Sequence, residues 1–182
     1  MGGNTPGDLA RPAGGDVRAG LPFRAVNRRG TPAHDAGMQR HHLLPRQIMK
    51  VRCFATMFDQ IGRLAIGFED FRANGLLLPS IAKSALRTGL PLHCGPHRQY
   101  NELVQERVGC IERRWACQCP SDASHARVEA LMRLRLLQRA LRKRLMQREN
   151  RSLFLNRKDP FRAGVDFAEL DAMVEALWSA TA

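Results

Sequence analysis

Four of the six histidines in this 182-residue chain fall in two short groups that could bind a metal ion. His41 and His42 are adjacent, and three residues separate His93 from His97. The second spacing suits two ligands on one helix face, or on a turn that enters a helix. Adjacent side chains on a strand point to opposite faces, so His41 and His42 can have different roles. Three imidazole ligands would leave one coordination position open, as a catalytic metal centre requires.

A histidine-rich centre of this kind suits the hydrolysis of a phosphodiester bond. The reaction needs a base that deprotonates water, a cation that stabilises the leaving oxygen, and groups that hold the phosphate. The other two histidines, His34 and His125, lie in linker-like surroundings and receive no predicted role. The grouped histidines therefore favour a metal-assisted hydrolase.

The segment that carries His41 and His42 is predicted to be a short strand. It covers residues 39–44 and ends at Pro45. Helical spacing then extends over residues 46–61, where one face carries Ile48, Val51, Phe54, Ala55, Phe58 and Ile61. This pattern predicts an amphipathic helix directly after the histidine strand.

The middle of the chain is predicted to return to the histidine strand. Residues 64–68 are consistent with a short strand or a loop. The pair Asn74-Gly75 is a turn signal, and the apolar run 76–78 follows it. A second helix is predicted over residues 81–87.

Two long amphipathic helices are predicted in the second half. Gly95-Pro96 begins the first, because Pro suits the first helical turn, and its apolar face carries Tyr100, Val104, Val108, Ile111 and Trp115. The second covers about residues 122–149, with an apolar seam at Ala130, Leu134, Leu137, Leu141 and Leu145. A last helix is predicted from Asp166, an N-cap that Glu169 completes as a capping box.

These elements divide the chain into three predicted parts. Residues 1–37 are rich in glycine and proline and show no apolar period, which predicts a flexible leader. Residues 38–119 form the predicted core domain, and residues 120–182 form a basic helical extension. The predicted fold class is α+β and mostly helical, with the helical extension at the C-terminal end.

The net charge of +12 favours a polyanionic partner. Nucleic acid is the commonest such partner, and an anionic membrane surface or an acidic protein is the alternative. Arginine greatly outnumbers lysine, and its planar fork matches phosphate, although the codon preference of a GC-rich genome would give the same bias. The five cysteines are odd in number and irregularly spaced, so we expect thiols instead of a disulfide framework.

No targeting or membrane-spanning segment is predicted. The longest apolar runs fall far short of the ~20 residues that a membrane-spanning helix needs, so membrane insertion is not expected. The polar, Gly/Pro-rich start does not resemble a Sec signal peptide. We expect a protein of the bacterial cytoplasm, or one that is secreted or delivered into a target cell without such a signal.

Three blocks in order resemble the AHH branch of the HNH/endonuclease VII superfamily. The blocks are Arg40-His41-His42-Leu43-Leu44-Pro45, Asn74-Gly75-Leu76-Leu77-Leu78-Pro79 and Leu92-His93-Cys94-Gly95-Pro96-His97-Arg98-Gln99-Tyr100-Asn101. The likeness covers about residues 38–108. It implies a ββα-metal fold, in which a β-hairpin packs on a helix with a divalent cation between them.

The resemblance also implies roles for single residues. His41, His93 and His97 would be metal ligands, and His42 would be the general base that activates water. Asn74 would be a clamp whose side chain fixes the loop that carries His42. Cys94 or water could take the place of His93 in the metal shell, and Asn74 could itself be a ligand. Zn, Ni, Mg and Mn remain open as the cation.

Basic residues around these blocks are expected to bind nucleic acid. The resemblance implies that Arg98 contacts the scissile phosphate. Arg40 stands where the family has a small residue and is expected to add a phosphate contact. Arg46, together with Arg142 and Lys143 of the basic extension, is expected to bind the sugar-phosphate backbone. The 31 residues between His42 and Asn74 imply that the hairpin carries a helix in its loop.

The resulting expectation is a metal-dependent endonuclease that cuts DNA, with RNA as a close second substrate. Members of the family often form the C-terminal end of bacterial toxins that act against competitors, which implies a toxin or effector nuclease and an acidic immunity protein as partner. The alternative is a nucleic-acid-binding or adaptor protein with a decayed nuclease motif. A weaker alternative is a membrane-surface role for residues 127–148, but the charges there surround much of the helix instead of one face, which argues against it.

Overall fold

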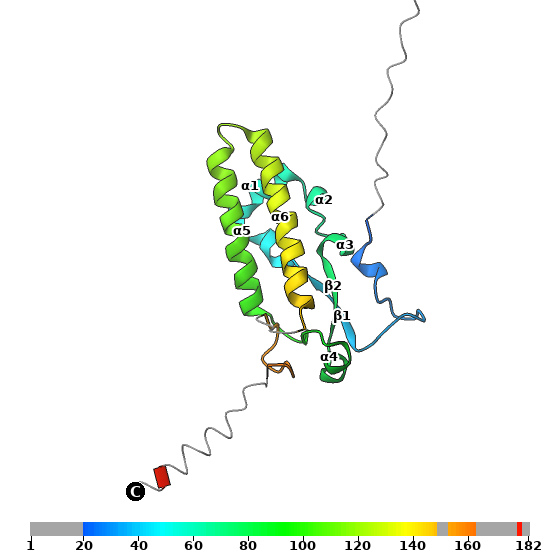
Figure 1. The fold of residues 1–182 in the computed structure, drawn as a ribbon. Helices are drawn as coiled ribbons and strands as arrows, with labels where there is room; N and C mark the ends of the chain where they lie inside the picture. The colour runs from blue at the N-terminus through cyan, green and yellow to red at the C-terminus, as the bar shows by residue number, and fades with distance from the viewer. Residues whose placement is uncertain (1–19, 149–152, 163–177, 180–182) are drawn as a thin grey trace, which may run out of the picture.

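The structure is a computed structural model, which describes residues 20–148, 153–162, 178 and 179 (Figure 1). Its elements follow one another as η1 (Phe23–Ala25), β1 (Met38–His42), η2 (Arg46–Lys50), α1 (Arg52–Ile61), α2 (Arg63–Ile66), α3 (Phe71–Asn74), β2 (Gly75–Pro79), α4 (Ala82–Thr88), α5 (Arg98–Gln118) and α6 (Ala123–Met146). Two strands among many helices confirm the predicted α+β, mostly helical fold class.

The two strands form an antiparallel hairpin that places the histidine pair. His41 lies opposite Leu76, and His42 lies opposite Gly75. The loop of this hairpin contains η2, α1, α2 and α3, which confirms that the long insertion carries helical structure. The ends of the insertion meet again where the Leu43 N–H donates to the Asn74 carbonyl at 2.8 Å.

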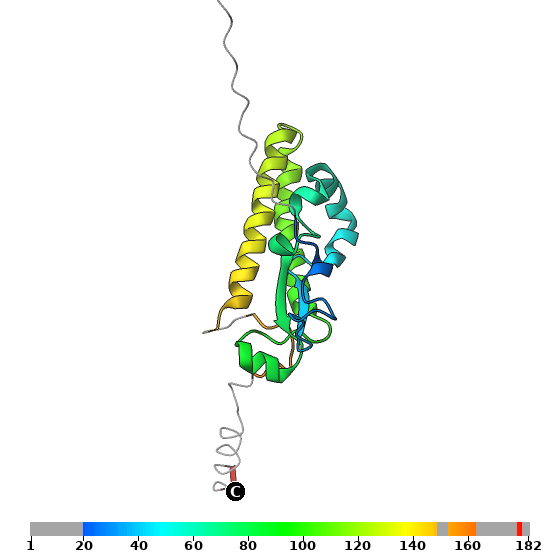
Figure 2. The ribbon, with the colours of Figure 1, turned by 90° about the vertical axis from the view of Figure 1, so that its right-hand side faces the viewer.

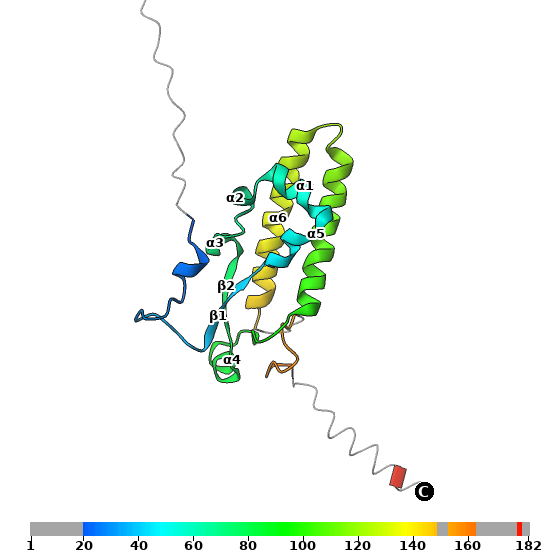
Figure 3. The same ribbon diagram turned by 180° about the vertical axis from the view of Figure 1, so that it is seen from behind.

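The two long helices pack side by side on one side of the molecule, and the hairpin with its inserted helices lies on the other (Figure 2). Seen from behind, α1 crosses both long helices (Figure 3). The apolar face predicted for α5 is confirmed, because all five of its residues are buried. Most of the seam predicted for α6 is buried too, and Gln138 lies within it as a buried polar residue.

The inserted helices differ from the prediction in how the chain is divided among them. The amphipathic stretch 46–61 is divided into η2 and α1, and residues 64–68 overlap helix α2 and form no strand. Gly62 and Gly67 have φ values of +88° and +76°, a region that favours glycine, and they end α1 and α2. Asn74-Gly75 does not form a tight turn, since Asn74 ends α3 and Gly75 begins β2.

The outer parts of the chain contact the hairpin and the long helices. In the predicted leader, the Leu21 N–H donates to Asp70 Oδ1 at 2.9 Å, and the Leu21 carbonyl accepts from the Phe71 N–H at 2.7 Å. The predicted boundary between core and extension falls in the turn between α5 and α6, and one hydrophobic core continues across it. The helix predicted from Asp166 lies outside the described residues.

All five cysteines are free thiols. Among the described residues, no helix combines the length and the apolar character that a bilayer crossing requires.

Candidate metal centre

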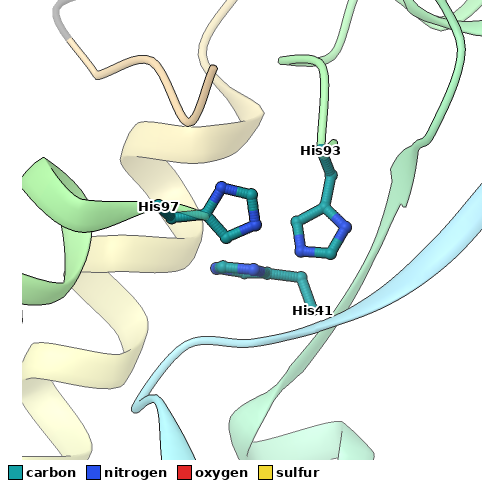
Figure 4. Close-up of side chains that lie close together, drawn as sticks. All are labelled: His41, His93 and His97. Atoms are coloured by element: carbon teal, nitrogen blue, oxygen red, sulfur yellow. The ribbon is translucent and has the colours of Figure 1, made fainter. Parts of the chain in front are cut away.

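Three histidines from separate parts of the chain point toward one another (Figure 4). His41 comes from β1, His93 from the loop after α4, and His97 is the N-cap of α5. One nitrogen of each ring lies within 4.8 Å of the corresponding nitrogens of the other two. The structure therefore brings together the three ligands that the sequence predicts.

Two of the three histidines are positioned by contacts with backbone carbonyls. The His93 N–H donates to the carbonyl of Pro79 at 2.7 Å, which joins the ligand loop to the end of β2. His97 Nδ1 lies 3.0 Å from the carbonyl of Leu155. A proton on Nδ1 satisfies that carbonyl and leaves Nε2 free to bind a metal, as is usual for metal-bound histidine.

Tyr100 packs against His41. The two rings meet edge to face, with their centroids 4.9 Å apart. The buried Tyr100 hydroxyl donates to the carbonyl of Leu43 at 2.6 Å. The sequence predicts Tyr100 only as a core residue of α5, but this bond also fixes the chain directly after the histidine pair.

The electrostatics of the cluster suit a bound cation. His41 Nε2 and His93 Nδ1 are buried and have no hydrogen-bond partner among the described residues. Burial lowers the pKa of His41 to about 2 and the pKa of His93 to about 4, and the neighbouring imidazoles act in the same direction. The rings of His41 and His93 are therefore held neutral, which is the form that binds a metal. The three side chains fit a divalent metal.

The alternative ligands do not join this cluster. Cys94 is exposed, and among the described residues the group with metal-binding spacing comprises the three histidines alone. Asn74 is fully buried and its side chain bonds to the backbone. Its Oδ1 accepts from the Leu44 N–H at 2.7 Å, and its Nδ2 donates to the Leu44 carbonyl at 3.2 Å. These are the contacts expected of a clamp.

A second buried amide extends the Asn74 network. Gln138 of α6 donates from Nε2 to Asn74 Oδ1 and to the Ile66 carbonyl, each at 3.3 Å. Sequence reasoning missed Gln138, although a lone amide within an apolar seam is the signal that would have found it. The amide links α6 to the residue that holds the chain after His42.

His42 lies on the opposite face of β1 from the cluster of His41, His93 and His97. Its ring stacks on Phe23, with centroids 3.8 Å apart and planes within 4°. Gly75 lies opposite, and the Phe71 ring occupies the place that a Cβ there would need. Phe71 in turn packs against Phe23. Sequence reasoning missed Phe23, because it lies in the segment predicted to be a flexible leader.

A cavity of about 530 Å³ opens beside His42, and we call it the His42 cavity. Its lining includes Arg24, Arg40, Arg46 and Glu69. Arg40 Nη1 donates to the Phe23 carbonyl at 2.9 Å, and Arg46 Nη2 lies 3.8 Å from Glu69 Oε1. Burial lowers the pKa of His42, so its ring is neutral and can accept a proton.

The other predicted nucleic-acid-binding residues lie apart from the His42 cavity. Arg98 is exposed at the start of α5 and lines a second cavity beside His97. Arg142 donates from Nη2 to the Arg72 carbonyl at 2.7 Å. Lys143 is exposed on α6. Neither Arg142 nor Lys143 lines the cavity beside His42 or the one beside His97.

We call residues 153–162 the tail segment. It forms several hydrogen bonds with the loop that carries His93 and His97. Besides the contact of Leu155 with His97, the Leu92 N–H donates to Asp159 Oδ2 at 2.7 Å. Asn156 Nδ2 donates to the Cys94 carbonyl. Asp159 is buried, and its Oδ1 also accepts from the Phe161 N–H at 3.0 Å. The tail segment thus contacts this loop at three points. They are Leu92 before His93, Cys94 between the two histidines, and His97 itself.

Replacing Asp159 by asparagine should therefore weaken metal binding by about 10–100-fold, as is typical for partners that orient ligands. Asparagine keeps the side-chain volume but places an N–H₂ group against the N–H donor of either Leu92 or Phe161. Calorimetric titration of the metal-free protein with Zn²⁺ would measure the change. Asp122→Asn, which alters the N-cap at the far end of α6, is the matched control. Equal affinities of the two variants would contradict the role of the tail segment.

One comparison with known proteins bears on this arrangement, a match to a protein family. No curated protein and no solved structure matches the chain. Residues 22–140 match a family described as a nuclease family of the HNH/ENDO VII superfamily with conserved AHH. The chain carries Arg40-His41-His42 at its histidine pair, so arginine stands in place of the alanine of that description. The match covers more than half of the chain, and the protein belongs to this AHH nuclease family.

Proposed function

We propose that this protein is a metal-dependent endonuclease that hydrolyses phosphodiester bonds in DNA. The observation that carries the proposal is that the two adjacent histidines of β1 face different sites. His41 faces two further imidazoles on one side, and His42 faces a basic cavity on the other. Membership of a nuclease family makes nucleic acid the substrate class.

His41, His93 and His97 would hold the divalent cation. When bound, the cation stabilises negative charge on the phosphate and the leaving oxygen. The Leu155 carbonyl fixes the ring of His97 through Nδ1, and Tyr100 packs against His41. The protein's part in this centre is to hold the three rings in place before the substrate arrives.

His42 would act as the general base. Its Nε2 is buried and has no hydrogen-bond partner among the described residues, and we assign this nitrogen to accept the proton of the attacking water. Phe23 stacks on the ring and fixes its plane. Asn74 holds Leu44, two residues further along the chain, by bonds to both its N–H and its carbonyl. The Phe23 contact therefore fixes the His42 ring, and the Asn74 bonds fix the backbone that follows it.

Arginines in the His42 cavity would hold the substrate backbone. Arg24, Arg40 and Arg46 line it, with Glu69 as the one acidic residue among its lining residues. The net charge of +12 supports a polyanionic substrate. We favour DNA, and the same groups can act on RNA because hydrolysis of either requires the same base and cation.

We further propose a toxin or effector role in bacteria, with action in the cytoplasm of the producing cell or of a target cell. An acidic immunity protein would be its natural inhibitor, since its charge would complement the basic surface. Addition of the product of a neighbouring acidic reading frame should abolish cleavage. Full activity in the presence of every such protein would overturn this part of the proposal.

The proposal predicts that the purified protein nicks supercoiled plasmid only when a divalent metal is present. Excess EDTA should abolish nicking, and an excess of Zn²⁺, Ni²⁺, Mn²⁺ or Mg²⁺ should restore it, because the three imidazoles need the cation to stabilise charge. Agarose gels report the nicked form, and structured RNA is tested in parallel. If neither substrate is cut with any metal, a nucleic-acid-binding protein with a decayed nuclease motif describes the chain better.

A further inference from the structure

A second basic cavity of about 420 Å³ lies beside His97, and we call it the tail pocket. It opens between the start of α5 and the tail segment. Its lining consists of Pro96, Arg98, Gln99, Phe154, Leu155, Asn156, Arg157, Lys158 and Arg162. Four of these residues are basic and none is acidic. Most of them lie beyond residue 140, where the family match ends.

The tail segment that builds this pocket is anchored. Leu153 and Leu155 are buried and belong to the hydrophobic core. Asn156 Oδ1 accepts from the Lys158 N–H at 2.7 Å, and the Arg162 N–H donates to the Asp159 carbonyl at 3.0 Å. These local bonds fix the turns of the backbone that carry the cations. The pocket is therefore a formed feature of the surface.

The charges of the pocket lack a counterion within the described part of the chain. No ion pair there involves Arg98, Arg157 or Lys158, and the same is true of Arg162. The guanidinium of Arg162 lies over the Phe154 ring, with its carbon 5.9 Å from the ring centroid. Four cations around one small cavity create a positive potential, and guanidinium groups match the oxygens of a phosphate.

The pocket also lies next to the metal centre. Leu155 lines it, and the carbonyl of the same residue contacts His97 Nδ1. Arg98 lines it and directly follows His97 in the chain. A phosphate in the pocket would therefore lie beside the metal ligands, and the pocket shares no lining residue with the His42 cavity.

We propose that the tail pocket binds a backbone phosphate of the nucleic-acid substrate, beside the phosphate that is cleaved. This inference rests on the proposed function and deepens it. The substrate backbone would contact the protein at two basic sites, the His42 cavity and the tail pocket. The tail segment would thus have two tasks, since it also holds the ligand loop.

The test measures binding without cleavage, in the full chain with His42→Ala. Lys158→Gln and Arg162→Gln are combined in this background, and the control combines Lys83→Gln and Arg107→Gln. Both control residues are exposed, and neither lines the pocket. Fluorescence anisotropy of a labelled DNA duplex is recorded as a function of salt. Because both double variants lose two charges, any difference between them reports the position of the charges.

We expect the tail-pocket variant to bind DNA about tenfold more weakly than the control at moderate salt. The slope of log K against log[salt] should become shallower by about 0.9 for each phosphate that the variant no longer binds. Equal affinities and equal slopes of the two double variants would overturn the proposal. Because no cleavage is measured, a protein that binds DNA but cuts nothing would fail the proposed function and still test the pocket.

Thermal unfolding of each variant checks that the tail segment remains in place. If the double variant unfolds at a lower temperature than its control, Arg157→Gln replaces it. The Arg157 side chain is exposed and lines the pocket, and within the part of the chain that the structure describes it makes no ion pair. Weaker DNA binding by Arg157→Gln than by Arg107→Gln would support the proposal, and equal binding would overturn it.

Discussion

Replacing His42 by alanine should lower the rate of plasmid cleavage by a factor of about 10²–10⁴, the usual contribution of a general base. The loss should be confined to catalysis, because His42 lies on the opposite face of β1 from the metal cluster. Metal affinity, measured by calorimetric titration, should stay close to that of the unaltered protein. His42→Gln should lose as much activity, since glutamine fills part of the space but cannot accept the proton at neutral pH.

The matched control is His34→Ala, a histidine outside both cavities and outside the metal cluster. It should cleave plasmid at the normal rate. Two results would count against His42 as the base. One is cleavage within a few-fold of normal in both His42 variants. The other is a loss of metal binding that parallels the loss of activity, which would make His42 part of the metal shell.

Periodicity and residue type predicted the parts of this fold that depend on local pattern. The apolar face of α5 repeats along the helix, and all of its predicted residues are buried. The strand alternation of His41 and His42 predicted opposite faces, and one ring meets the metal cluster while the other meets Phe23. Helix α1 ends at Ile61, where the predicted helix also ends, and Gly67 ends α2 within residues that the pattern predicted to be a strand or a loop.

Contacts between distant parts of the chain left no pattern that could be interpreted. The bond between His97 and Leu155 spans 58 residues and uses a backbone carbonyl, which every residue offers. The bond between Asp159 and the Leu92 N–H spans 67 residues. Phe23 reaches His42 from a Gly/Pro-rich stretch that has no apolar period. The three histidines could thus be predicted from their spacing together with the family resemblance, but the residues that orient them could not.

Adding Zn²⁺ to the metal-free protein should raise its unfolding temperature, because only the folded chain brings the three imidazoles together. At a free metal concentration of about 100 times Kd, binding contributes about 2.7 kcal/mol to the free energy of unfolding. A domain of this size gains about 2–4 °C for each kcal/mol, so we expect a rise of roughly 5–11 °C. Differential scanning fluorimetry, with and without Zn²⁺, measures the shift.

The variant that separates this effect from non-specific binding is His97→Ala. His97 is only partly buried at the first turn of α5, so its removal should leave the helix folded while the metal loses one of its three ligands. The Zn²⁺-dependent rise should largely disappear. His125→Ala, on the exposed start of α6, should keep the full rise. If His97→Ala kept it as well, the metal would bind elsewhere, and the buried nitrogens of His41 and His93 would need another partner to offset their desolvation.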